Sequence, residues 1–233
     1  MSMPMAERIV NGVLRTVIRT FCRVDPRELD PIPKTGPAIL VTNHSTNLEG
    51  PIYYVLLDPR KKTALGKREL WNNWATRFFM QLWGVIPLHR GGPDRRALRK
   101  AKEALARGEL LGIAPEGTRS RTGTLQRGRP GAALLATSME VPIVPMVQWG
   151  VQDLLRNLRR FRRTTLHFRV GTPFFLRVPS GDSPSRDDLR KMTDEIMFQL
   201  AVLLPESLRG YYRDLTRMTH DYIRPIDDTT TQP

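Results

Sequence analysis

The segment Ala38-Ile-Leu-Val-Thr-Asn-His-Ser-Thr-Asn-Leu-Glu49 opens with an unbroken apolar run and continues into a polar turn. A short apolar run of this kind is consistent with a strand buried on both faces, which we expect over residues 38–42. A helical pattern follows near residues 47–57. Because a strand that leads directly into a helix is the repeating unit of α/β proteins, the segment indicates an α/β fold.

The same alternation of short apolar runs and helical patterns continues along the chain. Successive strands separated by helices favour a parallel arrangement, so we predict an α/β sandwich with a central, largely parallel sheet. The last helix opens with Ser185-Arg-Asp-Asp188, a variant of the capping box. The other strands are expected over 63–66, 85–88, 110–114, 143–148 and 166–170, and the other helices near 69–83, 94–107, 128–138 and 185–204.

Residues 1–24 are predicted to form an amphipathic, basic helix ahead of the sheet. Arg8, Asn11, Arg15 and Arg19 fall on the face opposite an apolar stripe. Such a stripe can pack on the domain's own core or lie in a membrane interface with the arginines among anionic headgroups, and the pattern alone permits both. The stripe consists of Ile9, Val10, Val13, Leu14, Val17, Ile18 and Phe21.

The rest of the 233-residue chain fits one domain over residues 25–224, followed by a polar tail over 225–233 that we expect to be disordered. No stretch approaches the roughly 20 apolar residues of a membrane-spanning helix, and the first residues lack the pattern of a secretory signal. Cys22 is the only cysteine, which excludes an internal disulfide and a zinc cluster built on cysteines. We therefore expect a cytoplasmic protein.

The net charge of +14 favours polyanions as partners, and 30 of the 37 basic residues are arginine. Nucleic acid, an anionic membrane leaflet and an acidic carrier protein are all compatible with this charge. The densest basic run, 156–163, permits a solvated loop, a phosphate-binding patch or a membrane contact. Phe161 is the only aromatic residue inside that run, whereas nucleic-acid binding usually needs several stacking positions, so we do not expect nucleic-acid binding.

His44 and Glu49 directly follow the first predicted strand, at the sheet edge where α/β proteins bind ligands. Their spacing of five residues would separate them by about 140° on a regular helix. His44 must therefore lie in the turn before the helix if the carboxylate is to meet the imidazole. A carboxylate there would fix the tautomer of the ring and leave the other ring nitrogen free to take a proton.

Two further polar segments follow strands. The segment Gly84-Val-Ile-Pro-Leu-His-Arg90 ends on an arginine, and Ala114-Pro-Glu-Gly-Thr-Arg-Ser120 contains Gly117, which can adopt a turn closed to other residues. Arg90, Arg119 and Lys67 are thus expected to converge with His44 at one edge of the sheet. Arginines in such an arrangement bind phosphate through directed hydrogen bonds.

These segments resemble the glycerolipid acyltransferases that include 1-acylglycerol-3-phosphate O-acyltransferase. The family's first motif, Asn-His followed by four residues and Asp, corresponds to Asn43-His44 with Glu49. The second corresponds to Gly84–Arg90, the third to Pro115–Ser120, and the fourth to Val141-Pro-Ile-Val-Pro145. All four occur in the family's order within roughly residues 35 to 150.

The resemblance implies that His44 deprotonates an acceptor hydroxyl for attack on an acyl thioester, supported by Glu49. It implies no metal, no cofactor and no covalent enzyme intermediate. The donor is acyl-CoA or acyl carrier protein, and the acceptor is lysophosphatidic acid, which becomes phosphatidic acid in phospholipid biosynthesis. The resemblance assigns the acceptor's glycerol phosphate to Arg90, Glu116, Gly117 and Arg119, and with Lys67 and Thr118 these form the expected substrate-binding set.

Two alternatives stay open at this point. The same motifs occur in enzymes that acylate other lysophospholipids, glycerol 3-phosphate or amino-lipids, and a basic lipid-binding protein could keep the fold without catalysis. A lipid acceptor favours membrane contact for the N-terminal helix, and hence a peripheral location on the inner face of the cell membrane.

The sequence departs from the family at position 49, where Glu replaces the usual Asp. Glu adds a methylene, and a misplacement of about 1 Å can reduce a rate around a hundredfold. The site is therefore either adapted to the longer side chain or less active because of it.

Overall fold

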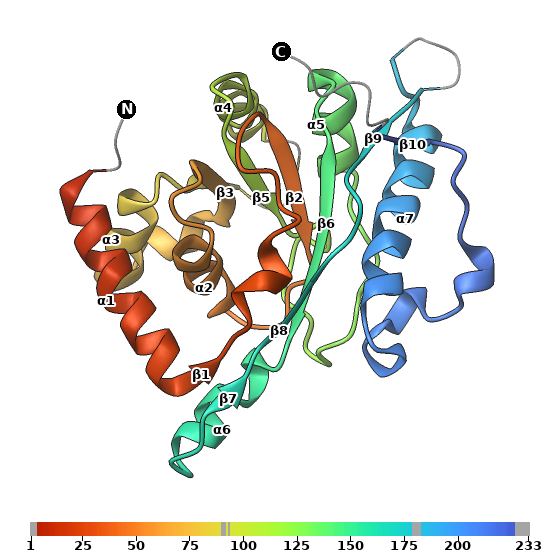
Figure 1. Cartoon of the computed structure of the whole chain (residues 1–233). Helices are drawn as coiled ribbons and strands as arrows, with labels where there is room; N and C mark the ends of the chain where they lie inside the picture. Colours follow the sequence, from red (N-terminus) through yellow and green to blue (C-terminus); the bar gives the residue numbers. More distant parts are fainter. Residues whose placement is uncertain (1–3, 90–91, 93, 179–182, 227–233) are drawn as a thin grey trace.

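The structure is a computed structural model that describes residues 4–89, 92, 94–178 and 183–226. It contains a mixed α/β fold with a central sheet and a separate N-terminal helix (Figure 1). The helices are α1 (Met5–Phe21), α2 (Glu49–Leu56), α3 (Trp74–Leu82), α4 (Arg95–Ala106), α5 (Gly131–Met139), α6 (Leu154–Leu158) and α7 (Arg186–Leu203). The strands are β1 (Cys22–Arg23), β2 (Ala38–Thr42), β3 (Lys62–Lys67), β4 (Ile86–Leu88), β5 (Leu110–Ile113), β6 (Ile143–Trp149), β7 (Thr164–Thr165), β8 (His167–Val170), β9 (Phe174–Leu176) and β10 (Ile223–Pro225).

The main sheet has the strand order β10-β9-β6-β2-β5-β3-β4, with β8 also paired to β6. Strands β6, β2, β5, β3 and β4 are parallel, whereas β8 and β9 run antiparallel to β6. The prediction of a largely parallel sheet is thus confirmed. Because the five parallel strands share one direction, their carboxyl ends lie at one edge, and this edge carries the polar segments described above.

Helices cover both faces of the sheet (Figure 1). All five residues of β2 are buried, and their side chains alternate between two apolar clusters. Ile39 and Val41 pack with α4, α5 and α7, whereas Ala38 and Leu40 pack with α1 and α2. This double burial explains why β2 has an unbroken apolar sequence.

Several elements differ from the sequence prediction. The helix expected over 69–83 is split into a 3-10 turn, Arg68–Trp71, and α3. The split occurs at Asn73, whose side chain accepts hydrogen bonds from the first backbone N–H groups of α3 and so begins a new helix. The elements not predicted were β1, β7, β9, β10 and α6. Pro225 of the expected tail ends β10, and residues 227–233 lie outside the described residues.

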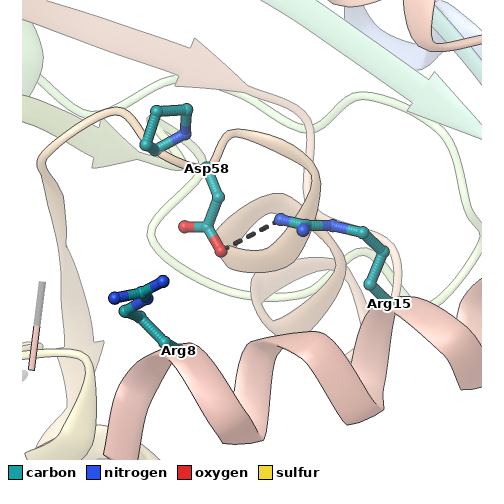
Figure 2. A pocket seen from close by; sticks show the side chains of 4 residues that line it. Arg8, Arg15 and Asp58 are labelled. Carbon is teal, nitrogen blue, oxygen red and sulfur yellow. Dashed lines mark hydrogen bonds and ion pairs between the residues drawn. The ribbon is translucent and has the colours of Figure 1, made fainter. Parts of the chain in front are cut away.

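The helix α1 docks on the body of the protein through residues from both of its faces. The buried side chain of Asn11 donates to Asp58 at 2.9 Å and accepts from the indole N–H of Trp83 at 3.0 Å. The guanidinium of Arg15 binds the same carboxylate at 3.2 Å, beside a shallow pocket also lined by Arg8 (Figure 2). Part of the polar face therefore packs inward, because Asp58 and Trp83 offer it hydrogen-bonding partners.

Most of the apolar stripe of α1 faces outward. Leu14 and Ile18 pack against the body of the protein, but the row at every fourth residue is exposed, from 77% at the first position to 42% at the last. That row consists of Met5, Ile9, Val13, Val17 and Phe21. An exposed apolar row of this kind is typical of a surface that binds a further partner.

Candidate active site

The candidate site lies at the carboxyl edge of the parallel strands. Thr42 ends β2, and the polar turn 43–48 leads directly into α2, whose first residue is Glu49. β5 lies on one side of β2 and β6 on the other, so that the segments following all three strands meet here. The sheet thus brings together residues from the first and third sequence motifs with Gln148 near the end of β6, whereas the fourth motif, Val141–Pro145, lies at the start of that strand.

His44 and Glu49 are in direct contact. The Nδ1 atom of His44 lies 2.7 Å from Oε2 of Glu49, with His44 in the turn and Glu49 at the start of the helix, as the spacing predicted. An ionised carboxylate only accepts hydrogen bonds, so Nδ1 carries the ring proton and Nε2 keeps its lone pair. The imidazole side chain is 26% exposed, whereas Glu49 is 2% exposed. The basic nitrogen is therefore on a ring that incoming molecules can reach.

Glu49 is held by four further hydrogen bonds, all to its Oε1 atom. The donors are the backbone N–H and hydroxyl of Ser45, at 2.8 and 2.6 Å, the backbone N–H of Thr46 at 2.7 Å, and the side-chain amide of Gln148 at 2.5 Å. Donors aimed at a carboxylate stabilise its ionised form and fix its position. The longer side chain of Glu thus reaches the imidazole from within a complete network.

Asn43 joins the site to β6. Its side-chain amide donates to the carbonyl of Gln148 and accepts from the N–H of the same residue, both at 2.9 Å. This pair of bonds extends the contact between the two segments beyond Thr42, the last residue of β2. It also places the side chain of Gln148 against Glu49.

The loop after β5 holds the backbone of His44. Oε1 of Glu116 accepts the backbone N–H of His44 at 2.9 Å, and the backbone N–H of Ser120 donates to the carbonyl of His44 at 2.8 Å. Oε2 of Glu116 accepts from the backbone N–H of Gln126 at 2.9 Å. Burial raises the pKa of Glu116, which is 2% exposed. These contacts indicate a positioning role for Glu116, whereas the resemblance assigns it to the acceptor.

Gly117 has φ of +68°, as its expected turn requires. A Cβ atom at this position would lie 2.7 Å from Cδ of Arg129, so that a larger residue would displace the arginine. Arg129 is itself fixed at the backbone, where its N–H donates to the carbonyl of Pro115 at 2.8 Å. The turn thus carries a second arginine close to the third motif.

The other predicted binding residues lie along the same edge. Thr118 is half-buried and Arg119 is exposed in the loop after β5, and half-buried Lys67 ends β3, the neighbour of β5. Arg90 lies outside the described residues. Around the site, no group of described residues has the His, Cys, Asp or Glu constellation that could hold a metal ion.

Gln148, Ser45 and Gln126 take part in the site but were not predicted from the sequence. Gln148 is 99 positions from Glu49, and only the pairing of β2 with β6 brings them together. Ser45 lies inside the first motif, where a hydroxyl one residue after the histidine could have suggested a partner for the carboxylate. Gln126 has no sequence signal of this kind.

The fold and the site define an α/β protein whose sheet edge carries a partly exposed histidine supported by a buried carboxylate. The model of the Acyltransferase family matches residues 23–149, and this range contains every residue of the candidate site. The chain belongs to that family.

Named relatives agree with this assignment. The chain is 29% identical over 190 residues to the human 1-acyl-sn-glycerol-3-phosphate acyltransferase alpha, covering 79% of this chain and 64% of that protein. It is 24% identical to the 1-acyl-sn-glycerol-3-phosphate acyltransferase of Bacillus subtilis, covering 71% of this chain and 80% of that protein. The chain spans less than two thirds of the first curated relatives it matches, down to 40% for the chloroplastic protein of Brassica napus.

The fold also has a solved counterpart. The crystal structure of the 1-acyl-sn-glycerophosphate (LPA) acyltransferase PlsC from Thermotoga maritima matches with a TM-score of 0.61 at 22% identity, over 91% of this chain and 80% of that one. Over the described residues, none of the helices combines the length and apolarity needed to cross a bilayer.

Proposed function

We propose that this protein transfers a fatty acyl group from a thioester to the free hydroxyl of 1-acyl-sn-glycerol 3-phosphate, producing phosphatidic acid. The observation that carries the proposal is the contact between Nδ1 of His44 and the buried Glu49, which leaves Nε2 of a partly exposed imidazole as a base. The named relatives support the choice of acceptor.

In the proposed reaction, Nε2 of His44 takes the proton of the acceptor hydroxyl while its oxygen attacks the thioester carbonyl carbon. The carbon–sulfur bond then breaks, and the imidazolium returns the proton to the leaving thiolate. Glu49 stabilises the imidazolium between these two steps because its negative charge lies 2.7 Å from Nδ1. The proton thus passes from the alcohol through His44 to the thiol, His44 ends in its starting protonation state, and a thioester and an alcohol become an ester and a thiol.

The acceptor's phosphate is proposed to bind at Arg119, Thr118 and Lys67 along the carboxyl edge, with Gly117 shaping the turn. An exposed guanidinium in this loop can form two hydrogen bonds to one phosphate. Arg129 lies against the same turn and is a further candidate. Arg90 is assigned to the phosphate by the family resemblance alone.

The reaction is proposed to occur at an anionic membrane surface, on the inner face of the cell membrane. Two exposed aromatic residues on α3, Trp74 and Phe78, add to the exposed row of α1. Both helices pack around the same small apolar cluster, which contains Leu14, Phe79 and Met80. An apolar surface of this kind beside an excess of arginine is suited to the interface of an anionic leaflet.

A thioester-consumption assay with a panel of acceptors tests the proposal. Release of free thiol from acyl-CoA or acyl carrier protein is measured with 1-acylglycerol 3-phosphate, other lysophospholipids, glycerol 3-phosphate and an amino-lipid. We expect the highest kcat/KM with 1-acylglycerol 3-phosphate and none without acceptor. Faster turnover of another acceptor would reassign the substrate, and no turnover with any acceptor and either donor would contradict an enzymatic role.

A further inference from the structure

The segment that follows β6 projects from the carboxyl edge of the sheet and carries α6 near its tip (Figure 1). It returns to the sheet through β7 and β8. We call residues 154–163 the α6 tip. Three of its apolar side chains are exposed, with Leu155 at 63%, Leu158 at 42% and Phe161 at 100%. None of these three side chains belongs to the apolar core or contacts the His44 site.

Phe161 also has an unfavourable backbone conformation. Its φ is +52°, and the backbone N–H of Arg162 donates to the carbonyl of Asn157 at 2.9 Å, as in the helix ends where glycine usually occupies the left-handed position. A residue with a side chain adopts this conformation at an energetic cost, because its Cβ crowds the backbone. Phe161 is 100% exposed, so its ring makes no packing contact within the described chain that would offset this cost.

The charge around these apolar side chains points to one kind of partner. Between Val151 and Thr165 the chain has one acidic residue, Asp153, and five arginines, all exposed. Apolar side chains surrounded by arginines match an anionic bilayer, where the rings and aliphatic chains enter the interface and the guanidinium groups meet headgroups. Arg156 also pairs with Asp153 at 2.7 Å. The arginines are Arg156, Arg159, Arg160, Arg162 and Arg163.

The α6 tip is tied to the end of α1. Arg163 donates to the carbonyl of Arg19 at 2.6 Å and to that of Cys22 at 2.5 Å, at the carboxyl end of the helix. β1 pairs with β7, with Cys22 opposite Thr164, and the N–H of Leu166 donates to the carbonyl of Arg23 at 2.9 Å. Two regions with exposed apolar residues, far apart in the sequence, are therefore held in one arrangement.

We propose that the α6 tip is a second membrane-binding element, which inserts Phe161, Leu155 and Leu158 into an anionic leaflet and orients the His44 edge toward it. The proposal rests on the membrane location included in the proposed function. It adds the orientation of the protein on the membrane. Because α6 follows β6 at the edge that carries His44, insertion of α6 brings the site to the surface where a lipid acceptor resides. With α1 alone, the protein could rotate about the helix axis.

Vesicle binding of point variants tests the α6 tip. Co-sedimentation with vesicles of phosphatidylcholine and phosphatidylglycerol is compared for wild type, Phe161→Glu, Leu155→Glu and the control Val202→Glu. Val202 is 44% exposed on α7, which covers the sheet face opposite to α1. We expect the partition coefficient to fall about tenfold for each tip variant, as for loss of a partly buried apolar side chain, and to stay unchanged for the control.

A fluorescent label reports the depth directly. Cys22 is buried, so a cysteine introduced by Phe161→Cys reacts preferentially with an environment-sensitive thiol dye, and Val202→Cys is the matched control. We expect the emission at position 161 to shift to the blue when anionic vesicles are added, and the emission at position 202 to stay constant. Since both positions are exposed, neither change disturbs the core.

Three results would overturn the proposal, and they differ from one another. Equal binding of wild type and the tip variants would show that the α6 tip is not a membrane-binding element and would leave α1 as the membrane anchor. Absence of wild-type binding to anionic vesicles would contradict the membrane location as well. If the tip variants bind vesicles as well as wild type but have a higher KM for acyl carrier protein alone, the tip is instead a docking surface for an acidic protein.

Discussion

At the carboxyl edge of the sheet, polar side chains are shielded from water, whereas on α1 and the α6 tip apolar side chains face it. Glu49 and Glu116 are each 2% exposed, and both have all of their oxygens in hydrogen bonds. Phe161 and the exposed row of α1 have no such compensation. A buried carboxylate with complete partners is a fixed part of the site, while an exposed apolar row indicates a surface completed by something outside the chain.

The largest expected effect is at His44. We expect His44→Ala to reduce kcat/KM by about a thousandfold, since a general base typically contributes 10²–10⁴. The side chain is partly exposed, so thermal unfolding and vesicle binding should stay close to wild type. Thioester consumption in detergent measures the loss, and activity within about tenfold of wild type would reject His44 as the base.

Glu49 tests whether the site is adapted to its longer side chain. Glu49→Gln replaces the charge by an amide that cannot neutralise the imidazolium, and we expect kcat to fall by about a hundredfold or more. Glu49→Asp should also be slower, because the shortened side chain leaves either His44 or the donors on Oε1 without their partner. A faster Asp variant would contradict adaptation, and a fully active Gln variant would exclude an electrostatic role.

Arg119 is expected to act on binding rather than on the chemical step. Arg119→Ala should raise the apparent KM for the phosphorylated acceptor about tenfold, the effect of losing one charged hydrogen bond, with a smaller change in kcat. Arg190→Ala, at an exposed position of α7, is the matched control. Arg90→Ala is expected to resemble Arg119→Ala. If only the donor KM rises, the assignment to the acceptor's phosphate is wrong.

The exposed row of α1 can be tested without removing the helix. Deletion of residues 1–24 should weaken binding to anionic vesicles, but it also removes the core contacts of Asn11 and Ile18. The double variant Ile9→Glu/Val13→Glu changes only exposed positions, and we expect it to bind several-fold less tightly, with Val202→Glu as control. Wild-type binding should fall as salt rises. Equal co-sedimentation of the variants would contradict a membrane role for α1.

The smallest expected effect concerns stability and Glu116. Burial raises the pKa of this carboxyl above its ordinary value of 4.5, so the protonated form is favoured by folding. Its pH-dependent contribution is therefore present below the unfolded pKa and is lost as the pH rises through the folded one. We expect the difference in Tm between wild type and Glu116→Gln to shrink with rising pH across that window. A difference that grows would mean that the hydrogen bonds outweigh burial.

The sequence was most informative where a motif is local. The unbroken apolar run of β2, the turn at Gly117 and the contact of His44 with Glu49 each depend on neighbouring residues, and all three agree with the structure. The support of Glu49 by Gln148 depends on strand order, which spacing does not reveal. The inward packing of Asn11 on α1 was also not predicted, because helical periodicity does not show that Asp58 and Trp83 lie there as hydrogen-bonding partners.

The most direct test of the central claim is a double-mutant cycle on His44 and Glu49, measured as kcat/KM for acyl transfer to 1-acylglycerol 3-phosphate. If Glu49 acts through the imidazole, removing it matters only while His44 is present. The account predicts that His44→Ala/Glu49→Gln is as slow as His44→Ala alone. Losses that multiply in the double variant would show two independent contributions and would contradict a histidine base supported by this carboxylate.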